Sequence, residues 1–118
     1  MGQMRLEKVQ ALIKQEISQI LLREVKDPRI GFVTVTKVEV TKDLREARVF
    51  ISILGSEEQV AGTFEGLKSS LGFIRREIGH HVRLRFTPEI SFHLDRSLGY
   101  SAHIQELLTN IHREEAAH

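Results

Sequence analysis

Apolar residues in the first part of the chain recur at spacings of three and four, which is the period of an amphipathic helix. This stripe comprises Leu6, Val9, Ile13, Ile17, Ile20 and Leu21. Charged and polar residues such as Glu7, Lys14 and Ser18 take the opposite face. Pro28 disfavours the helical conformation at Asp27, so the pattern predicts a long amphipathic helix that ends before this proline.

The next apolar residues alternate with polar ones, which is the pattern of a half-buried β-strand. Between residues 32 and 41 the valines occupy first odd and then even positions, so the phase slips near Thr36 and Lys37. Either a β-bulge lies there or both faces of the strand are partly covered. A second alternation runs from residue 47 to 53, and the short polar stretch 41–45 between the two predicts an antiparallel hairpin.

Two helices separated by a break are predicted after the hairpin. Ser56, followed three residues later by Gln59, has the pattern of a capping box at a helix start. This helix runs to about Ser70, and a third helix starts at Gly72 and ends between residues 79 and 82. Glycine inside a helix costs roughly 1 kcal/mol relative to alanine, so it usually marks a kink, a break or a close backbone contact.

The rest of the chain predicts one more strand and one more helix. Thr87 and Pro88 open the strand, in which apolar and polar residues alternate from 90 to 94. The last helix follows Gly99 and has the apolar stripe Ile104, Leu107, Leu108 and Ile111. Helices in this order must cover one face of a three-stranded sheet. The predicted fold is therefore α+β, a two-layer sandwich with the order α-β-β-α-(kink)-α-β-α and a mixed sheet.

Length and composition bound the class of protein. With 118 residues the chain is expected to form a single domain over residues 1–118, with an ordered core at about 4–111 and a fraying tail at 112–118. The 41% apolar and 28% charged content is that of a soluble globular protein. No cysteine is present, which fits a reducing compartment and excludes a thiolate metal site. Without an apolar leader or a membrane-length apolar run, we expect a cytoplasmic protein.

The net charge of +1 hides an uneven distribution along the chain. Basic residues exceed acidic ones within residues 1–54 and 68–96, whereas residues 55–67 and 97–118 are acidic. The second basic segment directly follows the break at Gly72. It indicates either a place where the backbone approaches a polyanion, or a packing glycine followed by solvated arginines.

The predicted order α-β-β-α-α-β is that of the type II K homology (KH) domain, which binds single-stranded RNA through a helix-turn-helix with a GxxG loop. This chain has no GxxG at that point but has Ser70-Leu71-Gly72. With that departure, the chain resembles the ribosome-binding factor A family, whose kink is usually Ala-x-Gly, with Ser70 at the alanine position. The segments that carry the resemblance are 16–17, 24–32, 38–44, 72–76, 84–85, 88–92 and 95–97, of which Lys26 to Phe32 is the most specific.

The resemblance implies an assembly factor rather than an enzyme. Proteins of this family bind the free small ribosomal subunit and assist late maturation of its rRNA, including processing of the 5′ end, and they support growth in the cold. A ribosome-maturation GTPase helps to release them. The resemblance thus implies the small subunit and its rRNA as partners, and we expect a monomer that needs no cofactor.

RNA contacts are expected mainly from Arg and Lys side chains on phosphates, together with backbone N–H groups at the kink and the start of the third helix. The residues expected to make them are Arg29, Lys42, Arg45, Ser70, Gly72, Arg75, Arg76, Arg83 and Arg85. Phe50 and Phe73 are the obvious candidates for base stacking, although a place in the core explains each of them more simply.

A protein–protein interaction module is the alternative from a different class. In that case the basic residues would merely keep the domain soluble. The two functions differ in where the arginines lie: convergence on one face beside Gly72 favours RNA binding, whereas scattered arginines with an exposed apolar patch favour the module.

Metal and catalytic sites are not indicated by the sequence. His80 and His81 are adjacent, so on a helix they point apart, and no His-x-x-x-His pair occurs. No serine lies in a nucleophile-elbow motif, and no glycine-rich phosphate loop is present. A small phosphatase on a ferredoxin-like fold would need a fourth strand and an anion loop. We therefore expect neither a metal site nor catalysis.

Overall fold

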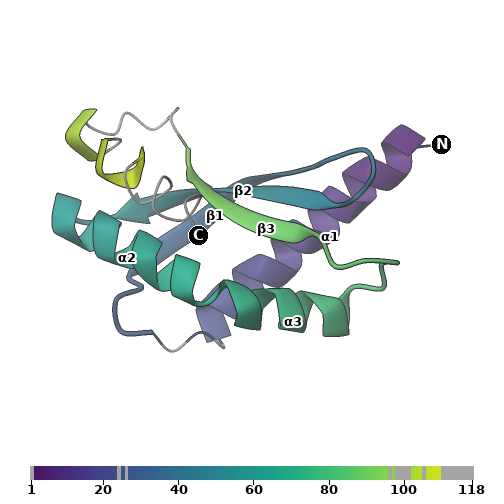
Figure 1. Cartoon of the computed structure of the whole chain (residues 1–118), viewed down its shortest axis with the longest axis horizontal. Helices are drawn as coiled ribbons and strands as arrows, with labels where there is room; N and C mark the ends of the chain where they lie inside the picture. Colours follow the sequence, from purple (N-terminus) through teal and green to yellow (C-terminus); the bar gives the residue numbers. More distant parts are fainter. Residues whose placement is uncertain are drawn as a thin grey trace.

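A three-stranded sheet carries helices on one face (Figure 1). The structure is a computed structural model that describes residues 2–23, 25, 27–95, 97, 102–104 and 106–109. Its elements are α1 (Gly2–Arg23), β1 (Phe32–Val40), β2 (Glu46–Leu54), α2 (Glu57–Ser69), α3 (Leu71–His81) and β3 (Glu89–Leu94). The predicted α+β sandwich of the type II KH-like order is confirmed.

The sheet is mixed, with the strand order β1-β2-β3. β1 and β2 form the predicted antiparallel hairpin, and β2 and β3 run parallel because the α2–α3 crossing returns the chain to the same end of the sheet. The register of the hairpin shifts between Val35 and Lys37, which confirms the predicted bulge. The Thr36 hydroxyl donates a hydrogen bond to the Phe50 carbonyl at this point (3.2 Å). The bulge explains the phase slip, since it lets Val35 and Val38 both face the core.

The core lies between the sheet and the helices. Strand β2 crosses its centre, and its inward residues from Ala47 to Ile53 are all buried, in strict alternation with the outward ones. Helices α1 and α3 face it with the fully buried side chains Ile13, Ile17, Ile74 and Ile78. Helix α2 adds Val60, Phe64 and Leu67. These are the apolar stripes that the sequence predicted, so burial of each stripe fixes the rotation of its helix.

Helix α2 begins at the predicted capping box. The Ser56 hydroxyl oxygen accepts a hydrogen bond from the Gln59 N–H (3.2 Å), and the Gln59 side-chain oxygen accepts one from the Ser56 N–H (2.7 Å). Two amide groups at the helix start are thereby satisfied.

The break between α2 and α3 lies at Ser70, two residues before the position that the sequence predicted. The Ser70 N–H donates to the carbonyls of Gly66 and Leu67 (both 3.1 Å), while the Ser70 carbonyl accepts from the Ile74 N–H (2.9 Å). Ser70 thus ends one helix and starts the next. The Ser70 hydroxyl also donates to the Gly66 carbonyl (2.9 Å), which competes with the helical bonding pattern and favours the bend.

The close backbone contact expected at Gly72 is made by Gly66 instead. A Cβ atom on Gly72 would meet nothing within 4 Å, so this glycine does not pack against another part of the described chain. A Cβ on Gly66 would lie 2.8 Å from Cγ1 of Ile30 and 3.4 Å from Cγ of Asp27. Helix α2 can approach the loop after α1 only because residue 66 has no side chain.

Two pieces of the predicted last helix fall within the described residues. Residues 102–104 and 106–109 are helical, and Ile104 and Leu108 are buried as predicted. The core boundary at residue 111 and the tail at 112–118 lie outside the described residues. None of the described helices has the length and the apolar character that crossing a bilayer requires.

Candidate functional site

An open hollow of about 670 Å³ lies where the loop after α1 meets the α2–α3 junction. One wall comes from residues 25–29 and the other from the junction. The hollow is lined by Val25, Asp27, Pro28, Arg29, Ser69, Ser70 and Phe73. Two of the predicted contact residues, Arg29 and Ser70, therefore share one concave surface.

Arg29 is held in this hollow by Asp27. Its guanidinium donates from Nε to Asp27 Oδ1 (3.0 Å) and from Nη2 to Asp27 Oδ2 (2.7 Å), and it also reaches the Ser69 hydroxyl (3.1 Å). These hydrogen bonds lower the pKa of Asp27 to about 2 and raise that of Arg29. The Nη1 nitrogen makes no hydrogen bond to the described residues, and the side chain is 45% exposed. The fixed guanidinium therefore has N–H groups left for an anion.

The loop that carries Arg29 is fastened to α2 by Thr63, a residue that the sequence reasoning missed. The buried Thr63 hydroxyl donates to the Arg29 carbonyl (3.1 Å) and accepts from the Gly31 N–H (3.2 Å). Thr63 lies in the buried stripe of α2 next to Phe64. A polar residue within an otherwise apolar helical stripe is the sequence feature that could have indicated this role. Together with the contact at Gly66, this fixes the position of Arg29 relative to the junction.

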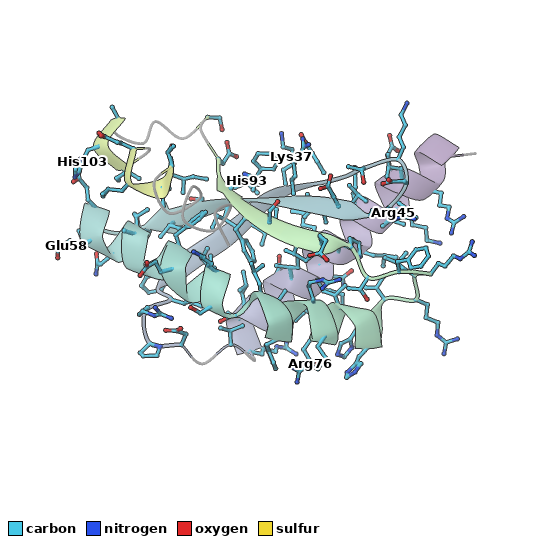
Figure 2. All side chains as sticks on the ribbon, viewed as in Figure 1. Lys37, Arg45, Glu58, Arg76, His93 and His103 are labelled. Atoms are coloured by element: carbon cyan, nitrogen blue, oxygen red, sulfur yellow. The ribbon has the colours of Figure 1, made fainter. Side chains whose placement is uncertain are left out.

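Gly72 and Arg76 present the first two turns of α3 to solvent. Both residues are exposed, and Arg76 makes no ion pair with the described residues. Figure 2 shows Arg76 on the side of α3 that points away from the sheet. A ligand that lies along this side would meet the guanidinium and the bare backbone at Gly72.

Arg75 points the other way and is used inside the protein. Its Nε donates to the Pro88 carbonyl and its Nη2 to the Thr87 carbonyl, both at 3.1 Å. Nη2 also lies 3.4 Å from the Glu89 carboxylate. The two neighbouring arginines of the basic segment thus differ in their contacts. Arg75 connects α3 to the loop before β3, whereas Arg76 faces solvent.

Arg45 and Arg85 come together at another place, at the tip of the β1–β2 hairpin. Each guanidinium carbon lies 5.6 Å from the centre of the Phe86 ring. The Glu89 N–H donates to the Arg45 carbonyl (2.8 Å), which joins the hairpin to the loop before β3. In Figure 2 Arg45 lies well away from Arg76. The predicted residues therefore form two groups, one at the junction and one at the hairpin tip, rather than a single patch.

The remaining predicted residues are placed as follows. Lys42 and Arg83 are exposed, in the hairpin turn and just after α3. Phe50 and Phe73 are partly buried: Phe50 packs against the Lys37 ammonium (4.5 Å) and the His93 ring (5.5 Å), and Phe73 lines the hollow. Within the described part of the chain, no three His, Cys, Asp or Glu side chains gather in a way that could hold a metal ion.

Comparison with known proteins identifies the family. A sequence model of the ribosome-binding factor A family matches residues 5–108. The chain belongs to this family. The ribosome-binding factor A of Caldanaerobacter subterraneus subsp. tengcongensis is 54% identical over 104 residues, which cover 87% of this chain and 85% of that protein.

Solved structures of ribosome-binding factor A share the fold. The crystal structure of the Thermus thermophilus protein has a TM-score of 0.68 at 22% identity, with 75% of this chain and 93% of that chain covered. A homology model of ribosome-binding factor A from the same organism, fitted into a cryo-EM map of its 30S complex, gives a TM-score of 0.63 at 23% identity. That match covers 76% of this chain and 94% of the other. The resemblance seen in the sequence is confirmed.

Proposed function

We propose that this protein binds the free small ribosomal subunit through its rRNA and acts as an assembly factor, by binding rather than by catalysis. The observation that carries the proposal is membership of the ribosome-binding factor A family over almost the whole described chain. The finer roles that we propose are late maturation of small-subunit rRNA, 5′-end processing and growth in the cold. Further parts of the proposal are cytoplasmic action as a monomer and release by a maturation GTPase.

The α2–α3 junction supports rRNA binding by its chemistry. Arg29 is held at the rim of a hollow, and Arg76 is exposed on the outer side of α3. The start of α3 offers backbone N–H groups beside Gly72, where no side chain keeps a phosphate away. A positioned arginine beside the hollow, a second exposed arginine on α3 and helix-start amides suit the phosphates of a folded RNA.

Co-sedimentation tests this proposal. Purified protein is mixed with free small subunits, large subunits and assembled ribosomes at low and at moderate salt. We expect selective retention on free small subunits that weakens with salt, since phosphate contacts release counterions. Equal retention on all three particles, or retention on none, would contradict the proposal.

A protein–protein interface is the second candidate, because three apolar side chains lie exposed at the other end of the hairpin. Leu22, Phe32 and Leu54 are 82%, 79% and 76% exposed, and Phe32 and Leu54 are partners in the β1–β2 ladder. Exposed apolar surface of this kind is typical of contact sites. Failure of the protein to sediment with any ribosomal particle would favour this second candidate.

A further inference from the structure

An exposed aromatic ring lies close to two arginines at the hairpin tip. Phe86 is 55% exposed although the guanidinium carbons of Arg45 and Arg85 are both 5.6 Å from its centre. We propose that Arg45, Phe86 and Arg85 form a stacking platform for an unpaired base of the bound RNA. The proposal rests on the proposed function and adds a second contact surface, separate from the α2–α3 junction.

The loop that carries Phe86 is fixed from two sides. Arg75 of α3 donates to the carbonyls of the two residues that follow Phe86, and the second of these, Pro88, is fully buried. A Cβ on Gly79 would lie 2.9 Å from the Thr87 hydroxyl oxygen, so α3 lies directly against the loop. The Glu89 N–H holds the loop to the hairpin through the Arg45 carbonyl. The ring is therefore presented by a braced segment, which lowers the entropy lost on binding.

The charges around the ring favour an anionic partner. Arg45 and Arg85 make no ion pair with the described residues, and the exposed Lys42 and Arg83 belong to the same two loops. The acids of these loops include Asp43, whose carboxylate accepts from the Thr41 hydroxyl (2.6 Å) and the Arg45 N–H (3.1 Å). Glu89 lies beside Arg75, and Glu46 is exposed at the start of β2. Both guanidiniums are exposed to a ligand, and the nearby Asp43 carboxylate, whose pKa is lowered by the Thr41 hydroxyl and by Arg45, offsets only the charge of Arg45.

Planar cations next to an exposed aromatic ring suit an unpaired nucleotide better than a duplex. Bases in single-stranded loops stack on aromatic rings and on guanidinium planes, and the same guanidiniums can reach the flanking phosphates. Stacking tolerates any base, so the platform selects for an unpaired nucleotide rather than for a sequence. In a duplex the base faces are already occupied by their neighbours.

The test compares variants of the full chain for binding to purified free small subunits across a series of salt concentrations. Phe86→Ala and Phe86→Leu should weaken binding about ten-fold, whereas Phe86→Trp should keep it, since only the tryptophan retains a stacking surface. The salt slope should be unchanged in the Phe86 variants and should fall by about one unit in Arg85→Ala. Leu12→Ala, which removes an exposed apolar side chain from α1, is the control and should bind as the unmodified protein does.

Two results would overturn the platform and leave the proposed function standing. One is wild-type affinity of Phe86→Ala for the subunit. The other is photo-crosslinking from p-benzoylphenylalanine in place of Phe86 that yields only ribosomal-protein adducts, where we expect rRNA adducts at unpaired nucleotides. If the unmodified protein does not bind small subunits at all, the proposed function fails and the platform fails with it.

Discussion

Asp27 and Arg29 show how one carboxylate can position a cationic side chain for an external partner. The carboxylate accepts hydrogen bonds from two side-chain N–H groups and from the backbone N–H of the same arginine. The guanidinium is then fixed in direction while its second terminal nitrogen stays open. The sequence predicted Arg29 as a contact residue, but it could not predict this pairing, because Asp27 also suits a turn beside Pro28.

Asp27→Asn should lower stability at neutral pH, and the loss should depend on pH. The pKa of Asp27 falls from 3.8 to about 2 in the folded protein. A lowered folded-state pKa means that the ionised carboxylate stabilises the fold above pH 3.8, and that this contribution is lost as the pH falls through about 2.

Thermal unfolding of the two proteins between pH 6 and pH 2 measures this difference. The gap in Tm should be widest above about pH 4 and should close near pH 2, and added salt should narrow it because the Arg29 guanidinium is accessible to solvent ions. A gap that stays constant over the whole range would show that the ionised carboxylate is not responsible.

The α2–α3 pair shows which structural features can be predicted from the sequence alone and which cannot. The capping box at Ser56 and the bulge in β1 were predictable because each depends on neighbours within a few residues. The function of a helical glycine is set by what packs opposite it, and that is a long-range property. Gly66 lies in the same helical pattern as Gly72, yet only Gly66 faces another segment, the loop at Ile30.

The two glycines should therefore respond oppositely to alanine. Gly72→Ala places its methyl group in open space and should raise the free energy of unfolding by about 0.5–1 kcal/mol, through the higher helix propensity of alanine. Gly66→Ala must displace Ile30 and should lower it by about 1–2 kcal/mol. Urea unfolding of both variants measures this, and effects of the same sign would refute the assignment of Gly66 as the packing glycine.

Over the molecule as a whole, the arginines divide into those that the fold uses and those that it leaves open. Arg75 is hydrogen-bonded to the loop before β3, and Arg76 is exposed on the outer side of the same helix. A one-dimensional charge count cannot separate them, because the separation depends on where Thr87 and Pro88 lie in space. For the same reason the sequence reasoning missed Phe86, whose exposure depends on the loop around it.

This division predicts separate phenotypes for the two neighbours. Arg75→Ala should lower the free energy of unfolding by about 1–2 kcal/mol, because two carbonyls lose charged donors. Arg76→Ala should leave stability unchanged and reduce the salt slope of small-subunit binding by about one unit. Urea unfolding and binding titrations of both variants measure the two effects. The reverse pattern would mean that the two side chains have exchanged roles.

The central claim is that the surface at the α2–α3 junction contacts the small subunit, and Gly72→Val tests it most directly. The new side chain points into open space, so the unfolding free energy should stay within about 0.5 kcal/mol of the unmodified protein. It would also keep a phosphate from the start of α3, so affinity for free small subunits should fall by about ten-fold, the equivalent of one charged hydrogen bond. A stable Gly72→Val protein that binds the subunit with undiminished affinity would contradict the account.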